Sequence, residues 1–471
     1  ILSEDNKTVA GNATVNTHKP PVIKPVIKPV DSNGTAPEGN ATAPLREIIQ
    51  STDAGSAQFI FTSRGGGIAE VQLRDHPINT SKDTSAANLE FVDPNKPLDD
   101  GAMIEVIGKQ FKRVLERSPN EKEQARFLAL MQNAVKDTGR VIGVRDTLAA
   151  VNRVALNRGA PLPVFALWGT NQFLHLTGRE DYTLEPIGAT KGWRATLEAG
   201  NGLKIIKEFT PTGEFLMTNV VIQIQNLSTN QVMIPELHVG LGTSTPAGMG
   251  KLSDPMYHGM FWFDSNEDTH LESSDFANRT LGCFPGTPME KITLGNKNVR
   301  WTAVHNQFYT LIAMVPKGAL VPDSMTARHV DFSPDASTQL KAQNRYQASV
   351  TYRNEGTVLG PSQEWSVTLD LYAGPKKYRD LEALSIDRGN NQVDRVMDLG
   401  GFFGFFSKVL LLSMNGLHGW GCSYAIAIII ITLIIKMVFW PLTAASTRSM
   451  KRMGKLQPQM KEIQTKYKSD P

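Results

Sequence analysis

WGCSYAIAIIIITLIIKMVFWPL, residues 420–442, contains a single charged side chain, that of Lys436. As an α-helix rising about 1.5 Å per residue, this stretch is roughly 34 Å long, enough to cross the hydrocarbon core of a bilayer. We therefore predict a transmembrane helix here. The segments on its two sides are expected to lie in different compartments.

Basic residues follow this stretch closely. Five basic residues follow within about twenty positions, and Glu462 is the only acid in that window; the five are Arg448, Lys451, Arg452, Lys455 and Lys461. Because segments rich in lysine and arginine next to a span stay in the cytoplasm, residues 443–471 are predicted to start a cytoplasmic helical region. The long N-terminal part is then predicted to lie on the other face of the membrane.

The cytoplasmic segment carries an apolar stripe. Met450, Met453 and Met460 recur mostly at helical spacing, with lysines on the other faces. These methionines are candidates for contacts with a partner, although packing against a neighbouring helix explains the same stripe. Pro458 is predicted to end one helix and to begin a second, since proline removes a hydrogen bond from a helix interior.

Lys436 is the residue of the span that needs an explanation. A lysine at the centre of a membrane helix costs about 2.5 to 3.5 kcal/mol on insertion scales. Its side chain either reaches toward the membrane surface or faces a hydrated cavity. Thr432 lies one turn earlier on nearly the same face, while isoleucines cover much of the remaining surface. This polar stripe predicts a cationic, hydrated groove in which Lys436 and Thr432 face the substrate.

A second apolar segment precedes the span. GFFGFFSKVLLLSM, residues 401–414, is strongly apolar but short, and Lys408 interrupts it. Such a segment is typical of a helix that lies in the membrane interface. A buried core helix is the alternative reading of the same length. We assign residues 385–416 to a linker and this interfacial helix.

Most of the N-terminal part has the pattern of β-strands. Apolar and polar residues alternate from Gln58 onward, with a glycine run at 65–67 as a turn, and many short strands separated by turn signals follow up to Leu371. Residues 57–384 are therefore predicted to form a large antiparallel β-sandwich. A short exit helix is expected over 376–384, after Gly374-Pro375.

One segment interrupts the strand pattern. Residues 102–157 carry apolar side chains at helical spacing, which predicts an insert of two or three helices. The fold class is thus a mainly β domain with a helical insert, followed by an α-helical membrane segment.

Composition excludes several other classes of protein. Residues 1–56, with the repeat PVIKPVIKPV, have too few large apolar side chains for a core and are predicted to be a flexible linker. Lys plus Arg number 49 against 46 for Asp plus Glu, so no nucleic-acid surface is indicated. Cys283 and Cys422 lie 139 positions apart, so we predict that they form no disulfide and that both are free cysteines that serve packing.

Both chain ends are interpreted as cuts in a longer protein. The first residue is Ile1 and not methionine, and the lysine-rich amphipathic stretch before Pro471 shows no stop.

The C-terminal stretch resembles a known family. Residues 419–467 are similar to the second transmembrane helix and first cytoplasmic helix of the YidC/Oxa/Alb insertases, in the WG at 420–421, the PLT turn, the S-M-x-x-M spacing and the LQP triplet. Upstream, FTSRGGGIAEVQL and YAGPKKYRDL resemble the first strands and the exit of the periplasmic domain of Gram-negative YidC. The likeness spans residues 58–471.

This resemblance implies a sandwich of the supersandwich type in the periplasm and a multi-pass protein of the bacterial inner membrane. It implies an insertase that integrates and folds nascent membrane proteins, alone or with the Sec translocon, with the ribosome and the bilayer as further partners. The groove cation of the family is normally arginine, and here that position is Lys436. Lysine keeps the charge but lacks the planar fork of donors. Further transmembrane helices are expected before and after these residues.

Two other classes of function compete with an insertase. The family's sandwich resembles sugar-binding folds of the mutarotase type, in which His and Glu act as base and acid, and Glu236 and His238 are the candidates here. A membrane-anchored structural protein without a client would tolerate leucine at Lys436. We favour the insertase and expect no catalytic residue, no metal site and no cofactor.

Overall fold

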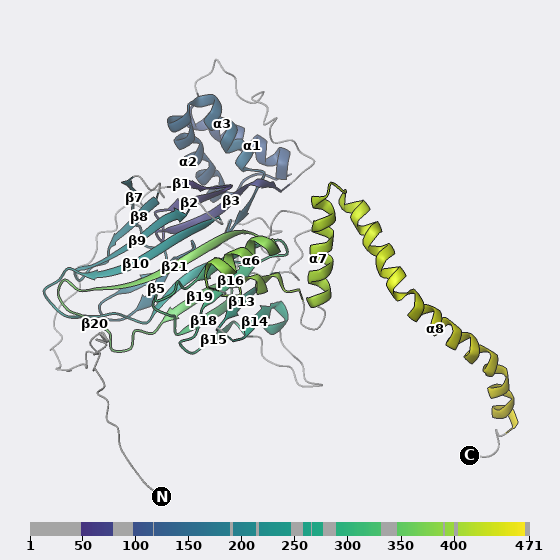
Figure 1. The fold of residues 1–471 in the computed structure, drawn as a ribbon. Coiled ribbons are helices and arrows are strands. Elements are labelled where there is room, and N and C mark those ends of the chain that lie inside the picture. The colour runs from purple at the N-terminus through teal and green to yellow at the C-terminus, as the bar shows by residue number, and fades with distance from the viewer. Residues whose placement is uncertain are drawn as a thin grey trace, which may run out of the picture. The chain divides into compact units, whose positions relative to one another are not determined.

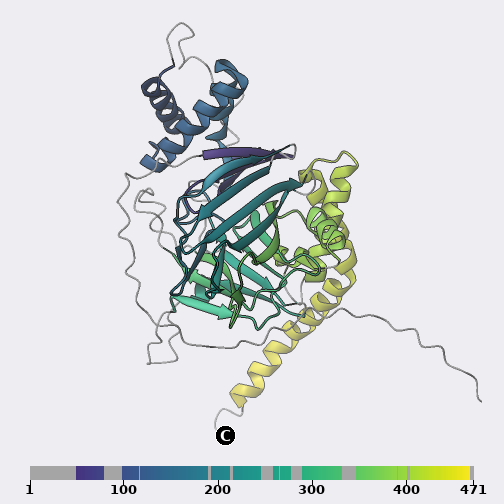
Figure 2. The same cartoon turned by 90° about the vertical axis from the view of Figure 1, so that its left-hand side faces the viewer.

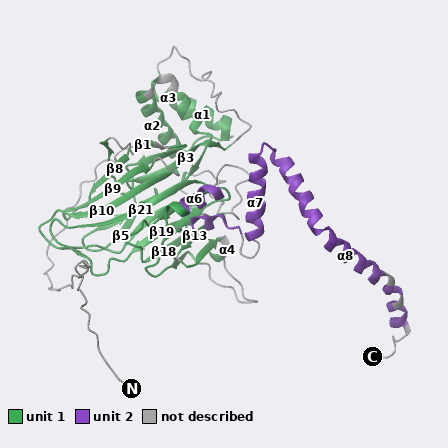
Figure 3. Cartoon of the chain, in the orientation of Figure 1, with its two compact units in different colours: residues 1–376, 386–391 green, residues 377–385, 392–471 purple. Residues whose placement is uncertain are grey.

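The computed structural model describes residues 49–78, 98–115, 117–188, 192–212, 216–245, 258–264, 266–276, 289–330, 346–389, 391–399 and 404–466. They form two compact units, the first with residues up to 376 and 386–391, the second with residues 377–385 and from 392 onward (Figures 1 and 3). Most of the predicted linker lies outside the described residues, as does Cys283.

Two antiparallel sheets make up most of the first unit (Figures 1 and 2). The nine-stranded sheet has the order β14-β13-β16-β17-β21-β10-β9-β8-β7, formed by β7 Thr183–Ile187, β8 Gly192–Glu198, β9 Leu203–Thr212, β10 Met217–Asn226, β13 Gly259–Phe263, β14 Asp268–Glu272, β16 Trp301–His305, β17 Tyr309–Met314 and β21 Glu364–Pro375. The six-stranded sheet has the order β15-β18-β19-β12-β5-β6, formed by β5 Leu167–Thr170, β6 His175–Thr177, β12 Leu237–Thr243, β15 Lys291–Leu294, β18 Ser324–His329 and β19 Tyr346–Tyr352. β11 Val232–Met233 and β20 Val358–Leu359 form a separate short ribbon, and α4 Ser273–Phe276 follows β14.

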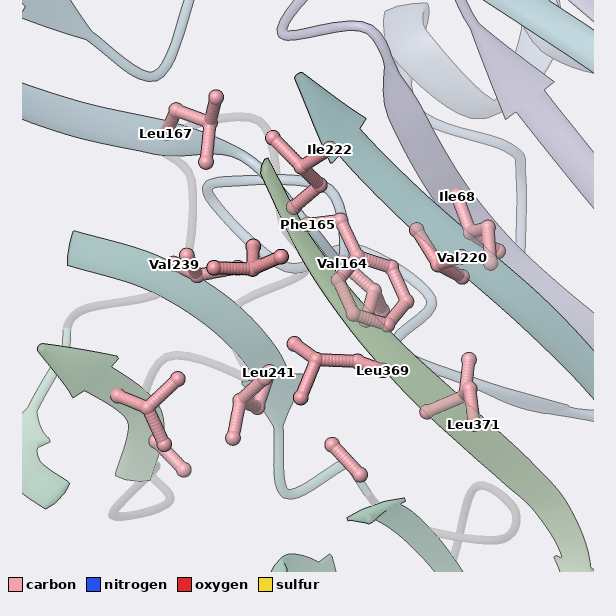
Figure 4. Close-up of a cluster of buried hydrophobic side chains, with 14 of the residues drawn as sticks. Ile68, Val164, Phe165, Leu167, Val220, Ile222, Val239, Leu241, Leu369 and Leu371 are labelled. Atoms are coloured by element: carbon pink, nitrogen blue, oxygen red, sulfur yellow. The ribbon is translucent and has the colours of Figure 1, made fainter. Parts of the chain in front are cut away.

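Alternation along the strands explains the sandwich. In β10, buried and partly exposed residues alternate, because successive side chains of a strand point to opposite faces. Val220 and Ile222 of β10 and Leu369 of β21 belong to the same buried cluster as Val239 and Leu241 of β12, across from them in the other sheet (Figure 4). The apolar faces of the two sheets therefore enclose one core, as the strand pattern predicted.

A third sheet carries the helical insert. It has the order β1-β2-β3-β4, with strands β1 Ile49–Ala54, β2 Ala57–Thr62, β3 Gly67–Pro77 and β4 Arg153–Leu156. Between β3 and β4 lie α1 Asp100–Leu115, α2 Glu121–Thr138 and α3 Arg140–Ala150, which Figures 1 and 2 show at one end of the sheets.

The helical insert is confirmed, but two predicted boundaries are wrong. Residues 49–54, expected in the linker, pair along their whole length with β2. Residues 153–156, expected in the insert, pair with β3. Residues 49–54 carry mostly small and polar side chains, so their composition matches that of a linker. Residues 153–156 are too few for apolar spacing to separate helix from strand without the pairing partner.

A buried ion-pair network holds the insert to the third sheet. Glu70 of β3 is 1% exposed and lies 3.2 Å from guanidinium nitrogens of both Arg126 of α2 and Arg158, which follows β4. Burial opposes ionisation of this carboxyl, but the charges of Arg158 and Arg126 and a hydrogen bond from Gln72 outweigh it and lower the pKa of Glu70 to about 2. The network therefore joins three segments that are distant in the sequence.

The glycine run packs against the sandwich. The backbone of Gly66 has φ of +53°, and a Cβ there would overlap the ring of Tyr182. The ammonium of buried Lys207 in β9 donates hydrogen bonds to the carbonyl oxygens of Gly65, at 2.7 Å, and Phe165, at 2.9 Å. Burial lowers the pKa of Lys207 to about 7. This turn thus needs glycine because of its conformation and its close contacts.

The second unit is helical. It contains most of α6 Tyr378–Asp387, a short 3-10 helix Val393–Met397, α7 Gly404–Gly419 and α8 Tyr424–Lys466. The predicted exit helix corresponds to α6, and the helix expected over 401–414 corresponds to α7. Lys408 of α7 lies 3.6 Å from the carboxylate of Glu382 in α6, which also accepts a hydrogen bond from Tyr378.

The predicted break at Pro458 is wrong. α8 contains both Pro441 and Pro458 and continues to Lys466, and Figure 1 shows it as one uninterrupted ribbon. A proline removes one hydrogen bond from a helix interior, and its ring clash is relieved by bending the helix as well as by ending it. The apolar stripe of methionines therefore lies on the same helix as Lys436.

Candidate functional site

Apart from Ala427, which is buried, the large apolar side chains of α8 are left uncovered by the described residues. Leu433, Ile434 and Met437 are 56%, 51% and 67% exposed, and only 6% of the most apolar window of the helix is buried. Within the described residues this is the one helix long and apolar enough to cross a membrane, and its most apolar 18-residue window has a mean hydropathy of 2.5. Side chains of this kind are stable only against lipid or against other helices.

Thr432 and Lys436 lie together on one face of α8, as the sequence predicted. Both side chains are exposed. The Thr432 hydroxyl donates to the carbonyl oxygen of Ile428 at 2.7 Å, which satisfies its polarity within the helix. Lys436 has no acidic partner in the described part of the chain. The ammonium of Lys436 is therefore the group on this face that still requires water or an anion.

Two further polar residues continue this face, and the sequence reasoning missed them. Thr443 and Thr447 follow Lys436 at seven and eleven positions, close to whole numbers of helix turns. Their hydroxyls donate to the carbonyl oxygens of Phe439 and Thr443 at 2.9 and 2.8 Å. The signal was the helical period extended beyond the predicted span. We call Thr432, Lys436, Thr443 and Thr447 the polar face of α8.

The predicted partner-contact residues form a separate stripe. Met450, Met453 and Met460 are 65%, 67% and 58% exposed on α8. Flexible thioether side chains fit irregular apolar surfaces. No neighbouring segment among the described residues covers these three methionines, so their partner stays a prediction.

α7 also exposes apolar side chains. Phe405 and Phe406 are 69% and 56% exposed, and none of the side chains of α7 is fully buried. The alternative of a buried core helix is not supported by this exposure. An exposed, mainly apolar helix with Lys408 as its ammonium group has the composition of an interfacial helix.

Glu236 and His238 come together near the start of β12. The Nε2 atom of His238 lies 3.3 Å from a carboxylate oxygen of Glu236, and its Nδ1 atom lies 2.9 Å from the hydroxyl of Thr351. The ring stacks on Trp168, and burial lowers the pKa of His238. Both ring nitrogens thus have partners, as in a histidine that serves packing. Within the described ranges no group of His, Cys, Asp and Glu side chains has the geometry of a metal site.

The likeness to solved structures is distant. A galactose mutarotase-like protein from Lactobacillus casei ATCC 334 aligns with a TM-score of 0.33 at 8% identity, over 69% of this chain and 99% of the other. A likeness this low supports no conclusion about the chemistry of Glu236 and His238.

Curated relatives match both the sandwich and the helices. The protein named membrane protein insertase YidC from Syntrophus aciditrophicus is 30% identical over 184 residues, 39% of this chain and 30% of that protein. Those of Geobacter metallireducens and Geobacter sp. strain M21 are 46% identical over 114 residues and 27% identical over 329 residues. These two alignments cover 24% and 69% of this chain, and 20% and 54% of the relatives. The chain thus spans about half or less of each relative's length.

Two family models divide the chain between them. The model described as the YidC periplasmic domain matches residues 171–412, half of the chain, and the model described as 60Kd inner membrane protein matches residues 416–471. The first covers most of the sandwich and the first half of α7, and the second covers α8 with its polar face. The chain therefore belongs to the YidC family of membrane protein insertases.

Proposed function

We propose that the full-length protein inserts and folds integral membrane proteins in the bacterial inner membrane, alone or beside the Sec translocon. Family membership supports this function, and one observation carries the mechanism. The ammonium of Lys436 lies in the otherwise uncharged, exposed run of α8 that ends at Leu442, with no acidic partner among the described residues. A buried charge in a membrane is costly, so its presence indicates a hydrated groove that it serves.

The polar face of α8 would form one wall of that groove. Water held near Lys436 shortens the distance over which the polar segment of a client crosses hydrocarbon. The ammonium attracts acidic or polar residues of the client, and the apolar side chains beside it accept the client's transmembrane segment. No bond is made or broken, so the protein acts as a chaperone and not through a catalytic residue.

The partners follow from this mechanism. Nascent integral membrane proteins are the clients, and the bilayer receives them. Sec components and the ribosome deliver them, with Met450, Met453 and Met460 as candidate contacts on the cytoplasmic side. The sandwich would bind or scaffold partners in the periplasm, and the alternative of a sugar-modifying enzyme has only the Glu236–His238 pair in its favour.

Complementation tests this function. Cells depleted of their own insertase stop growing, and expression of the full-length protein is expected to restore growth and the insertion of a membrane protein that needs the insertase. Failure of a stably produced, membrane-inserted protein to restore either would contradict the proposal.

The proposed orientation makes a separate prediction. The native cysteines of the protein are first replaced by serine. In intact spheroplasts, a membrane-impermeant maleimide should then label Glu267→Cys in the sandwich but not Lys461→Cys on α8. Because basic segments stay in the cytoplasm, Lys461→Cys should react only after lysis. Labelling of Lys461→Cys in intact spheroplasts, with Glu267→Cys protected, would reverse the orientation.

A further inference from the structure

Lys408 of α7 contacts two groups of α6. Its ammonium lies 3.6 Å from a carboxylate oxygen of Glu382 and 4.6 Å from the centre of the Tyr378 ring. A carboxylate and the face of an aromatic ring both attract a cation. All three residues belong to the second compact unit, so this contact lies within one unit.

The groups that receive the ammonium are held in place. Tyr378 is 5% exposed, and its hydroxyl donates a hydrogen bond of 2.6 Å to the Glu382 oxygen that faces Lys408. Asp394 of the 3-10 helix adds a second negative charge that acts on the same ammonium. The segments before α7 therefore present an acidic and aromatic site to one point on that helix.

This contact leaves an uncharged face of α7 exposed. Lys408 is the only charged side chain among residues 404–417. Phe406, Val409 and Leu410 lie about 100° to 200° around the helix from it, at about 100° per residue. They are 56%, 45% and 43% exposed. In an ordinary interfacial helix the lysine extends to the lipid headgroups, whereas here it contacts the protein.

The surroundings decide how strongly such a pair holds the helix. In water an exposed ion pair contributes little, because solvent screens it. Beside acyl chains the effective dielectric constant is lower, and the attraction between Lys408 and Glu382 is stronger. An ammonium without its partner would turn toward water or the headgroups and would rotate α7 about its axis.

We propose that Lys408 is a positioning residue for α7. Its contacts with Glu382 and Tyr378 hold the helix so that Phe406 and Val409, with Leu410, enter the acyl chains of the bilayer. The partner of this surface is the hydrocarbon part of the lipid and not its phosphate. The inference goes beyond the proposed insertase function, because it concerns α7 and not the polar face of α8.

Quenching of a fluorescent label by lipid tests the proposal in the full-length protein. The native cysteines are replaced by serine, and bimane is attached to Val409→Cys or to Asn415→Cys. Asn415 lies about two helix turns after Lys408 and therefore on the same face. In vesicles of phosphatidylcholine with a nitroxide on the acyl chain, the label at position 409 should be quenched much more strongly than the label at position 415.

Charge exchange separates the pair from a general loss of structure. Lys408→Glu should remove the difference in quenching between the two labels, and Lys408→Arg should keep it. Lys408→Glu combined with Glu382→Lys keeps opposite charges at the two positions and should restore most of the difference. Asp380→Lys, at an exposed acid of the same helix α6, is the matched control and should leave the difference unchanged.

Three results would overturn the proposal. The first is equal quenching of the two labels in the protein without further substitutions, and the second is a difference that survives Lys408→Glu or that charge exchange fails to restore. The third is a difference that requires added phosphatidylglycerol, which would assign Lys408 to lipid phosphate. Because the labels report on α7 and not on clients, each result is independent of whether the protein is an insertase.

Discussion

Replacing Lys436 with leucine or glutamate is expected to abolish growth of insertase-depleted cells that depend on the full-length protein. Leucine removes the charge that keeps the proposed groove hydrated, and glutamate reverses it. Arginine keeps the charge and adds donors, so Lys436→Arg should restore growth as well as the wild type does. The measurement is colony formation after depletion, together with the amount of each variant in the membrane.

Leucine provides a stringent version of this test. Because lysine costs about 2.5 to 3.5 kcal/mol in the centre of a span, Lys436→Leu makes α8 more stable in a membrane and not less. Loss of growth would then follow from the missing charge and not from failed insertion. Lys451→Leu, at a cation farther along the same helix, is the matched control and should keep growth. Full growth with Lys436→Leu would mean that the ammonium merely extends to the membrane surface.

Glu70→Gln is expected to destabilise the sandwich unit by about 3 to 5 kcal/mol, the cost of leaving buried guanidinium groups without their counter-charge. Arg126 and Arg158 both lie 3.2 Å from this carboxylate. Urea denaturation of the purified protein in detergent, followed by tryptophan fluorescence, measures the loss. Glu105→Gln on α1 is the control, because its exposed pair with Lys109 contributes at most about 1 kcal/mol.

The same carboxyl predicts a dependence on pH. The pKa of Glu70 is about 2 in the folded protein against an ordinary value of 4.5, so the unfolded chain binds more protons between these values. The stabilisation is therefore complete above pH 4.5 and is lost as the pH falls toward 2. In Glu70→Gln this part of the acid sensitivity should be absent. A variant as stable as the wild type would show that the network contributes nothing.

The sequence was sufficient for features that repeat along one element. Alternation along β10 and the uninterrupted apolar run of α8 predicted the sandwich and the span, and Lys436 was found because it is the only charge in that run. Glu70 occupies an alternate position that reads as solvent-facing, yet α2 covers it. That burial depends on contacts between residues far apart in the chain.

A cavity of about 590 Å³, formed where the loops after β15, β17 and β19 meet the start of β21, was beyond sequence reasoning for the same reason. Lys297, Asp323, Tyr352 and Trp365 come from four separate segments, and no one segment carries a recognisable motif.

Pro458 shows the opposite case, in which a clear local signal led to a wrong prediction. Its local preference for a helix end was clear, but the rest of α8 favours helix strongly enough to continue past it.

Photo-crosslinking from α8 tests most directly whether its polar face contacts clients. In the full-length protein, a photoreactive residue in place of Thr432 faces the proposed groove, while one in place of Ile434 lies about half a turn away. With a stalled nascent membrane protein bound, Thr432 is predicted to crosslink to the client and Ile434 to lipid. Client crosslinks from Ile434 that equal or exceed those from Thr432 would contradict the groove.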